Sequence, residues 1–148
     1  MATRTKTFEY TVALRREQGR VAVLESGDRP AVVTAPPGDF QEGDDARWSP
    51  EHLFLASLES CTMLSYLSHA EHNGVEVRDY TAEIEGTVMR RVEDGRYAFV
   101  FVRHRPRVVV AAGQREAARA LVGKAERDCF ISASTTAELQ VDWDVVEE

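Results

Sequence analysis

The sequence has few of the features that mark secreted, metal-binding or membrane-spanning proteins. It contains only two cysteines, Cys61 and Cys129, with no CxxC pair and no Cys/His grouping at the spacing of metal ligands. No apolar run reaches the ~20 residues that a membrane helix needs, and the start of the chain carries no hydrophobic signal region. We therefore expect a cytoplasmic protein without a structural metal or cofactor, in which a permanent disulfide is disfavoured.

Positive charge is also scarce. The 18 Lys and Arg residues stand against 25 Asp and Glu, which gives a formal net charge of -7. An acidic surface repels phosphates, so neither nucleic acid nor a membrane is expected as a partner. The one basic cluster, residues 103–107, is interpreted as the solvated end of a strand.

What is present is the composition of one globular domain, residues 1–148, with 43% hydrophobic and 29% charged residues. Helical spacing of apolar residues predicts one helix from Pro50 to Asn73-Gly74 and another over 114–127, and a Pro-, Gly- and Asp-rich loop covers 35–49. Alternating apolar residues predict strands at residues 8–14, 21–25, 31–34, 80–88, 96–112 and 137–145. This order of elements is typical of the α+β class.

The longer helix is apolar on nearly all sides. Ser49 can cap it, Pro50 suits its first position, and Glu59 is its one clearly charged residue before it ends at Asn73-Gly74. A helix of this kind is expected to be central and buried. Because one chain of this length has few elements to surround such a helix, we expect a partner subunit in a homodimer.

Both cysteines adjoin predicted helices. A thiol reacts as the thiolate, and its ordinary pKa of ~8.5 means that it needs a positive neighbour at neutral pH. Taken alone, Cys61 is more often packing, but the second thiol, Cys129, permits a transient disulfide. Glu51 lies about 15 Å before Cys61 along the helix, so any link between them needs a bridging arginine, Arg20 or Arg47, or a symmetry-related Glu51. Otherwise Glu51 is a carboxylate that the helix dipole favours.

The stretch SPEHLFLASLESC, residues 49–61, resembles the central helix of the OsmC/Ohr family, the osmotically inducible and organic hydroperoxide resistance proteins. The family's helix begins with a Pro-Glu pair and reaches the reactive cysteine ten positions after the glutamate, here Pro50, Glu51 and Cys61. A second family cysteine follows a helix in the C-terminal half, and Cys129 in ERDCFISAST matches it. The order of strands and helices also matches, up to the closing VDWDV strand.

The resemblance implies an OsmC-like fold, with antiparallel sheets around a central buried helix in an intertwined homodimer. It also implies a thiol peroxidase for fatty-acid or alkyl hydroperoxides. Cys61 would be the nucleophile, Cys129 would resolve its sulfenic acid to a disulfide, and an external dithiol, such as a lipoylated protein, would reduce that disulfide. Glu51 would hold the arginine that stabilises the Cys61 thiolate. Arg20, which follows a glycine, fits the hydroperoxide-resistance branch, and Arg47 fits the osmotically inducible branch.

Four aromatic residues are expected to line a pocket for bulky peroxides: Phe40, Trp48, Phe54 and Phe130. Phe130 stands where the family usually has proline, which indicates a divergent branch. The rival hypothesis is a binding protein that holds a small apolar ligand in the same dimer pocket, without significant peroxidase activity. A slow, unperturbed Cys61 would favour that rival.

Overall fold

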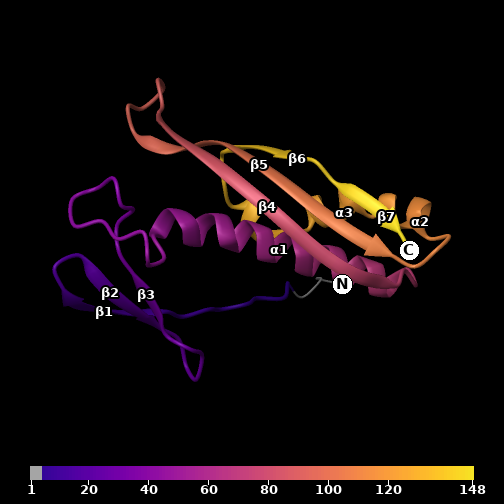
Figure 1. Ribbon diagram of the computed structural model, residues 1–148, viewed down its shortest axis with the longest axis horizontal. Coiled ribbons are helices and arrows are strands. Elements are labelled where there is room, and N and C mark those ends of the chain that lie inside the picture. Colours follow the sequence, from indigo (N-terminus) through magenta and orange to yellow (C-terminus); the bar gives the residue numbers. More distant parts are fainter. Residues whose placement is uncertain (1–4) are drawn as a thin grey trace. The chain divides into compact units, whose positions relative to one another are not determined.

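A computed structural model gives the structure of residues 5–148, and the chain divides into two compact units between Leu53 and Phe54. Figure 1 shows its helices and strands in chain order. No helix among the described residues is long and apolar enough to cross a membrane.

The first unit contains a three-stranded antiparallel sheet in the order β1-β2-β3. Its strands are β1 (Ala13–Gln18), β2 (Val21–Glu25) and β3 (Val32–Thr34). The predicted hairpin between the first two is confirmed, and Gly19 turns the chain there with a φ of 53°, a conformation that glycine adopts without steric cost. An isolated β-bridge joins Thr34, the last residue of β3, to Trp48 and closes the predicted loop.

The predicted first strand is placed too early. Alternating apolar residues suggested residues 8–14, whereas β1 begins only at Ala13. Phe8, Tyr10, Val12 and Leu14 are all more than 60% exposed. Alternation shows which side chains share a face, but a strand also needs a neighbour to accept its hydrogen bonds, and the pairing of β1 with β2 begins only at Ala13.

The long helix and the two long strands are confirmed in the second unit. Helix α1 (Pro50–His72) begins at the predicted proline, just before the division between the units, and continues into the second unit. Strands β4 (Val77–Arg90) and β5 (Tyr97–Val110) pair antiparallel. Two short strands, β6 (Glu138–Val141) and β7 (Asp144–Glu147), both pair parallel with β5, so this sheet is mixed.

Two predicted elements are divided in the structure. The helix predicted over 114–127 is two short helices, α2 (Arg115–Arg119) and α3 (Val122–Arg127), and a third, α4 (Phe130–Ala133), follows. The strand predicted over 137–145 is interrupted between β6 and β7. At that break Asp142 donates its N–H to the carbonyl of His104, and the ring of Trp143 packs 5.1 Å from that of Tyr66.

The core of the second unit lies between α1 and the sheet. Within α1 the fully buried side chains recur every fourth residue, at Leu58, Thr62, Tyr66 and Ala70. Most other side chains of α1 are only half-buried, because the described chain covers one side of the helix. Figure 1 shows α1 running along the β4–β5 pair, with α2 and α3 drawn near β7. The α+β class is thus confirmed.

Candidate functional site

Cys129 sits in a buried turn at the start of α4. Its backbone is extended, with φ -74° and ψ 113°, and its sulfur accepts the N–H of Ser132 at 3.4 Å. The sulfur therefore caps the helix as a serine or aspartate oxygen would. The hydroxyl of Thr62, on α1, also donates to this sulfur at 3.8 Å. Cys129 is 0% exposed, so solvent does not reach it directly.

The structure brings Cys61 to Cys129. Cys61 lies on α1 beside Thr62 and is half-buried, and its thiol hydrogen-bonds the sulfur of Cys129. The backbone N–H groups of Phe130 and Ile131 also point to the sulfur of Cys61. Both sulfurs therefore meet at the first turn of α4, although they are far apart in the sequence. A short helical turn supplies N–H donors to both of them.

Burial and hydrogen bonds shift the pKa values of the two thiols in opposite directions. Burial is the largest effect on Cys61 and raises its pKa, and the N–H groups of Ile131 and Phe130 lower it only in part. At Cys129 burial also acts to raise the pKa, but the N–H of Ser132 and the Cys61 thiol, with the Thr62 hydroxyl, bring it below its usual value. When the pair loses its first proton, the charge therefore settles on Cys129 and Cys61 donates to it.

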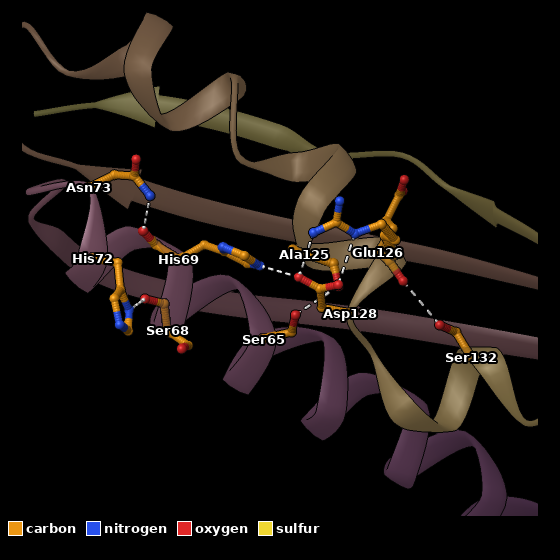
Figure 2. A network of polar contacts seen from close by, with 10 residues as sticks. Ser65, Ser68, His69, His72, Asn73, Ala125, Glu126, Asp128 and Ser132 are labelled. Carbon is orange, nitrogen blue, oxygen red and sulfur yellow. Dashed lines mark hydrogen bonds and ion pairs between the residues drawn. The ribbon is translucent and has the colours of Figure 1, made fainter. Parts of the chain in front are cut away.

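Polar contacts between α1 and the residues before Cys129 hold the second thiol in place (Figure 2). The Nε2 atom of His69 lies 2.7 Å from Oδ2 of Asp128, and Ser65 donates its hydroxyl to the carbonyl of Ala125 at 2.9 Å. Sequence reasoning missed these contacts. The one available signal was that Asp128 immediately precedes a candidate cysteine.

The three predicted charged residues all lie in the first unit. Arg20 pairs with Glu42 at 3.3 Å, and Arg47 pairs with Asp44 at 3.5 Å. All four side chains are about 40 to 50% exposed, so these pairs contribute little to stability. The Oε2 atom of Glu51 is buried and has no hydrogen-bond partner among residues 5–148. Neither arginine therefore binds this oxygen.

The predicted pocket aromatics differ in their surroundings. The ring of Phe54 stacks on that of Phe99, with centroids 4.6 Å apart. Phe40, Trp48 and Phe130 are each more than half exposed. Phe130 follows Cys129 directly in the chain, and its backbone N–H points to the sulfur of Cys61.

The profile of the OsmC-like protein family matches residues 43–144, a range that includes both cysteines and Glu51. The chain belongs to the OsmC-like family. The resemblance expected from residues 49–61 and from Cys129 is thereby confirmed. No curated protein matches the chain in sequence.

Solved OsmC-like structures share the fold over nearly the full chain. An OsmC-like protein of unknown function from Vibrio cholerae superposes with a TM-score of 0.83 and 21% identity, covering 95% of this chain and 100% of that one. An organic hydroperoxide resistance protein from Elizabethkingia anophelis gives 0.70 and 17%, covering 97% and 100%. The organic hydroperoxide resistance protein OhrB of Bacillus subtilis gives 0.62 and 21%, covering 92% and 98%. At these identities the likeness establishes the OsmC-like fold.

Proposed function

We propose that this OsmC-like protein is a thiol peroxidase that reduces organic hydroperoxides through Cys61 and Cys129. The observation that carries the proposal is the contact of the two thiols at the first turn of α4, where backbone N–H groups surround both sulfurs. Two thiols in hydrogen-bond contact need little movement to form a disulfide. The names of the hydroperoxide resistance proteins with the same fold support the choice of substrate class.

The reaction consumes two electrons and balances in three steps. The Cys61 thiolate attacks the outer peroxide oxygen, the O–O bond breaks, and the alkoxide leaves as the alcohol after taking up a proton. Cys61 is then a sulfenic acid, which Cys129 attacks to form the disulfide and release water. An external dithiol, such as a lipoylated protein, reduces the disulfide by thiol–disulfide exchange and is itself oxidised.

Cys61 is assigned as the nucleophile because it is the more accessible of the two thiols. Cys129 is fully buried and has its sulfur occupied by donors from Ser132 and Thr62. Since the first negative charge of the isolated pair settles on Cys129, a cation is needed to draw it to Cys61. We assign that task to Arg20 or Arg47.

Glu51 completes this assignment as a positioning residue. Its buried Oε2 atom has no partner among residues 5–148, and a carboxylate in that state is costly unless a cation pairs with it. An arginine guanidinium can bind such a carboxylate through two parallel N–H···O hydrogen bonds and still direct another N–H group at a sulfur. The partner subunit of a homodimer would cover the half-buried side of α1 and the exposed Leu64 on it, 60% accessible in one chain.

Single-cysteine variants test the assignment of roles. With cumene hydroperoxide and a dithiol reductant, Cys61→Ser should lose turnover, whereas Cys129→Ser should consume about one equivalent of peroxide and then over-oxidise. Mass spectrometry should find the added oxygen on Cys61. An enzyme that keeps full turnover as Cys61→Ser, or that acquires its first oxygen on Cys129, contradicts the proposed roles.

One observation favours a second function. Burial raises the pKa of Cys61, which slows a thiol that must act as a thiolate, and a protein that only binds an apolar ligand has no need to overcome this. The rate of Cys61 alkylation as a function of pH separates the two functions. A midpoint well below 8.5 in the assembled protein supports the peroxidase. A midpoint above it supports the binding protein.

A further inference from the structure

A cavity of about 170 Å³ lies inside the second unit, beside the thiol pair. It is bordered by α1, by strands β4, β5 and β6, and by the segment from α3 to α4. Its walls are largely aliphatic. The apolar side chains that line it are Leu58, Ile84, Val102, Leu139 and Val141.

The cavity lies at the end of the well-packed core between α1 and β5. Further along β5, Val108 and Val110 belong to the same buried cluster as Tyr66 of α1. About two turns earlier in α1, Leu58 lies over the part of β5 that carries His104, and there the cavity opens between helix and sheet. Protein interiors are otherwise close-packed, so a hollow of this size, partly open to solvent, is a specific feature of the site.

His104 is the polar residue on the otherwise apolar buried face of β5. It is 4% exposed, it lines the cavity, and its Nε2 atom has no hydrogen-bond partner among residues 5–148. Burial lowers the pKa of His104 to about 4, so the imidazole is neutral at physiological pH. A buried, unpartnered ring nitrogen is costly, because it has given up water without a replacement.

The other polar groups of the cavity wall are already engaged. The Thr62 hydroxyl shares its one proton between the carbonyl of Leu58, at 2.8 Å, and the sulfur of Cys129, at 3.8 Å. The Ser132 hydroxyl likewise shares its proton between the carbonyls of Glu126, at 3.1 Å, and Cys129, at 3.0 Å. The Oε1 atom of Glu126 accepts the indole N–H of Trp143 at 3.2 Å. Among the lining residues, Nε2 of His104 is the one buried side-chain nitrogen or oxygen without a hydrogen-bond partner in residues 5–148.

We propose that this cavity is a binding site for one small uncharged molecule that has an apolar ring and a single hydroxyl group, with the hydroxyl on Nε2 of His104. A cavity of about 150 Å³ holds a benzene molecule in another protein, so about 170 Å³ suits one six-membered ring and a substituent. A hydroxyl can donate or accept, so it fits either neutral form of the imidazole.

Charge decides which ring compounds enter. An anionic carboxylate would lose its hydration in an apolar space and face the carboxylate of Glu126, with no cation among the lining residues. The site should therefore select a neutral phenol over benzoate. The site is separate from the peroxidase proposal, since no step of the thiol chemistry uses His104.

The test compares phenol, toluene and benzoate on the full chain, with binding followed by NMR of ¹⁵N-labelled histidine side chains and of the backbone. Phenol and toluene share a ring and differ in the hydroxyl that would reach Nε2. Phenol should shift the His104 ring signals and bind about tenfold more tightly than toluene, because it pairs a buried nitrogen that toluene leaves unpaired. Benzoate should not bind.

Two variants locate the site. His104→Leu keeps a similar volume and should bring phenol and toluene within about twofold of each other, because the hydrogen bond is gone. His72→Leu, on the exposed end of α1, is the matched control and should keep the tenfold preference. Ile84→Phe should fill the cavity and weaken both ligands.

Three results would overturn the proposal. The first is no binding of phenol, or equal binding of phenol and toluene, by the wild-type protein. The second is a phenol preference that survives in His104→Leu. The third is a set of phenol-induced shifts that lies away from the cavity walls, which are α1, β4, β5, β6 and the segment from α3 to α4. The wild-type comparison alone decides the matter if a variant fails to fold.

Discussion

Replacing His104 by leucine should remove a pH-dependent loss of stability. His104 is 4% exposed, and burial lowers its pKa to about 4 from an ordinary 6.5. In the unfolded chain this histidine takes up a proton as the pH falls through about 6.5, whereas in the folded protein it stays neutral until about pH 4. Between these values the unfolded state binds more protons, so the wild-type protein loses stability as the pH falls.

The size of the effect follows from the two pKa values. A difference of about 2.5 units at about 1.4 kcal/mol per unit gives about 3 kcal/mol, lost in full only when the pH reaches about 4. At pH 7.5 this contribution is fully present, and His104→Leu differs from the wild type only by packing and by the loss of the unpaired Nε2 atom. Between pH 7.5 and pH 4.5 the unfolding free energy of His104→Leu should rise by about 2 to 3 kcal/mol relative to that of the wild type, which is most of the full effect.

Urea unfolding at fixed protein concentration, at pH 7.5, 6.0, 5.0 and 4.5, measures this difference. His104→Gln is the matched control, because glutamine is polar but does not titrate. Its curve should run parallel to that of His104→Leu even though its stability at pH 7.5 differs. If the two variants and the wild type keep a constant spacing at all four values, His104 is not buried in its neutral form and the reasoning fails.

Two further predictions concern the thiol pair and the packing of the sheet. Thr62→Val removes a donor to the sulfur of Cys129 and should raise the pKa of that thiol. The pH profile of the ultraviolet absorbance of its thiolate, in a Cys61→Ser background, measures this, and an unchanged profile would contradict the assigned hydrogen bond. Gly86→Ala should lower the unfolding free energy by about 1 to 3 kcal/mol, because its Cβ would lie 2.7 Å from the ring of Phe99. Gly123 lies within α3, and an added Cβ there would meet no atom within 4 Å, so Gly123→Ala should instead raise the unfolding free energy by about 0.5 to 1 kcal/mol. Equal effects of the two substitutions would contradict the role of packing at Gly86.

Long, strongly periodic segments were predictable from the sequence. Helix α1 starts at Pro50 and ends near Asn73-Gly74 as its capping residues indicate, and β4 and β5 follow their alternation. The breaks within the segments after β5 were not predictable. The apolar spacing continues across the end of α2, and at the interruption before β7 Trp143 contacts Tyr66 of α1, which is distant in the sequence.

The candidate site was predictable in its residues but not in its geometry. Spacing and resemblance singled out Cys61 and Cys129, but only the fold shows that they meet at α4 and that Cys129 holds the lower pKa. His104 was not predictable as a site residue, because it lies within a basic cluster whose charges indicate a solvated strand end. The two-residue alternation of β5 instead turns His104 inward, between arginines that are half-buried or exposed at 103, 105 and 107.

The most direct test of the central claim is a free-thiol count with intact mass on the reduced protein. The protein receives one equivalent of cumene hydroperoxide or, separately, of hydrogen peroxide. We expect rapid loss of both thiols, a mass lower by about two hydrogen atoms per chain, and a faster reaction with the organic peroxide, because a Cys61–Cys129 disulfide forms. Two intact thiols after prolonged exposure would contradict it and would leave Cys61 and Cys129 as packing residues of a binding protein.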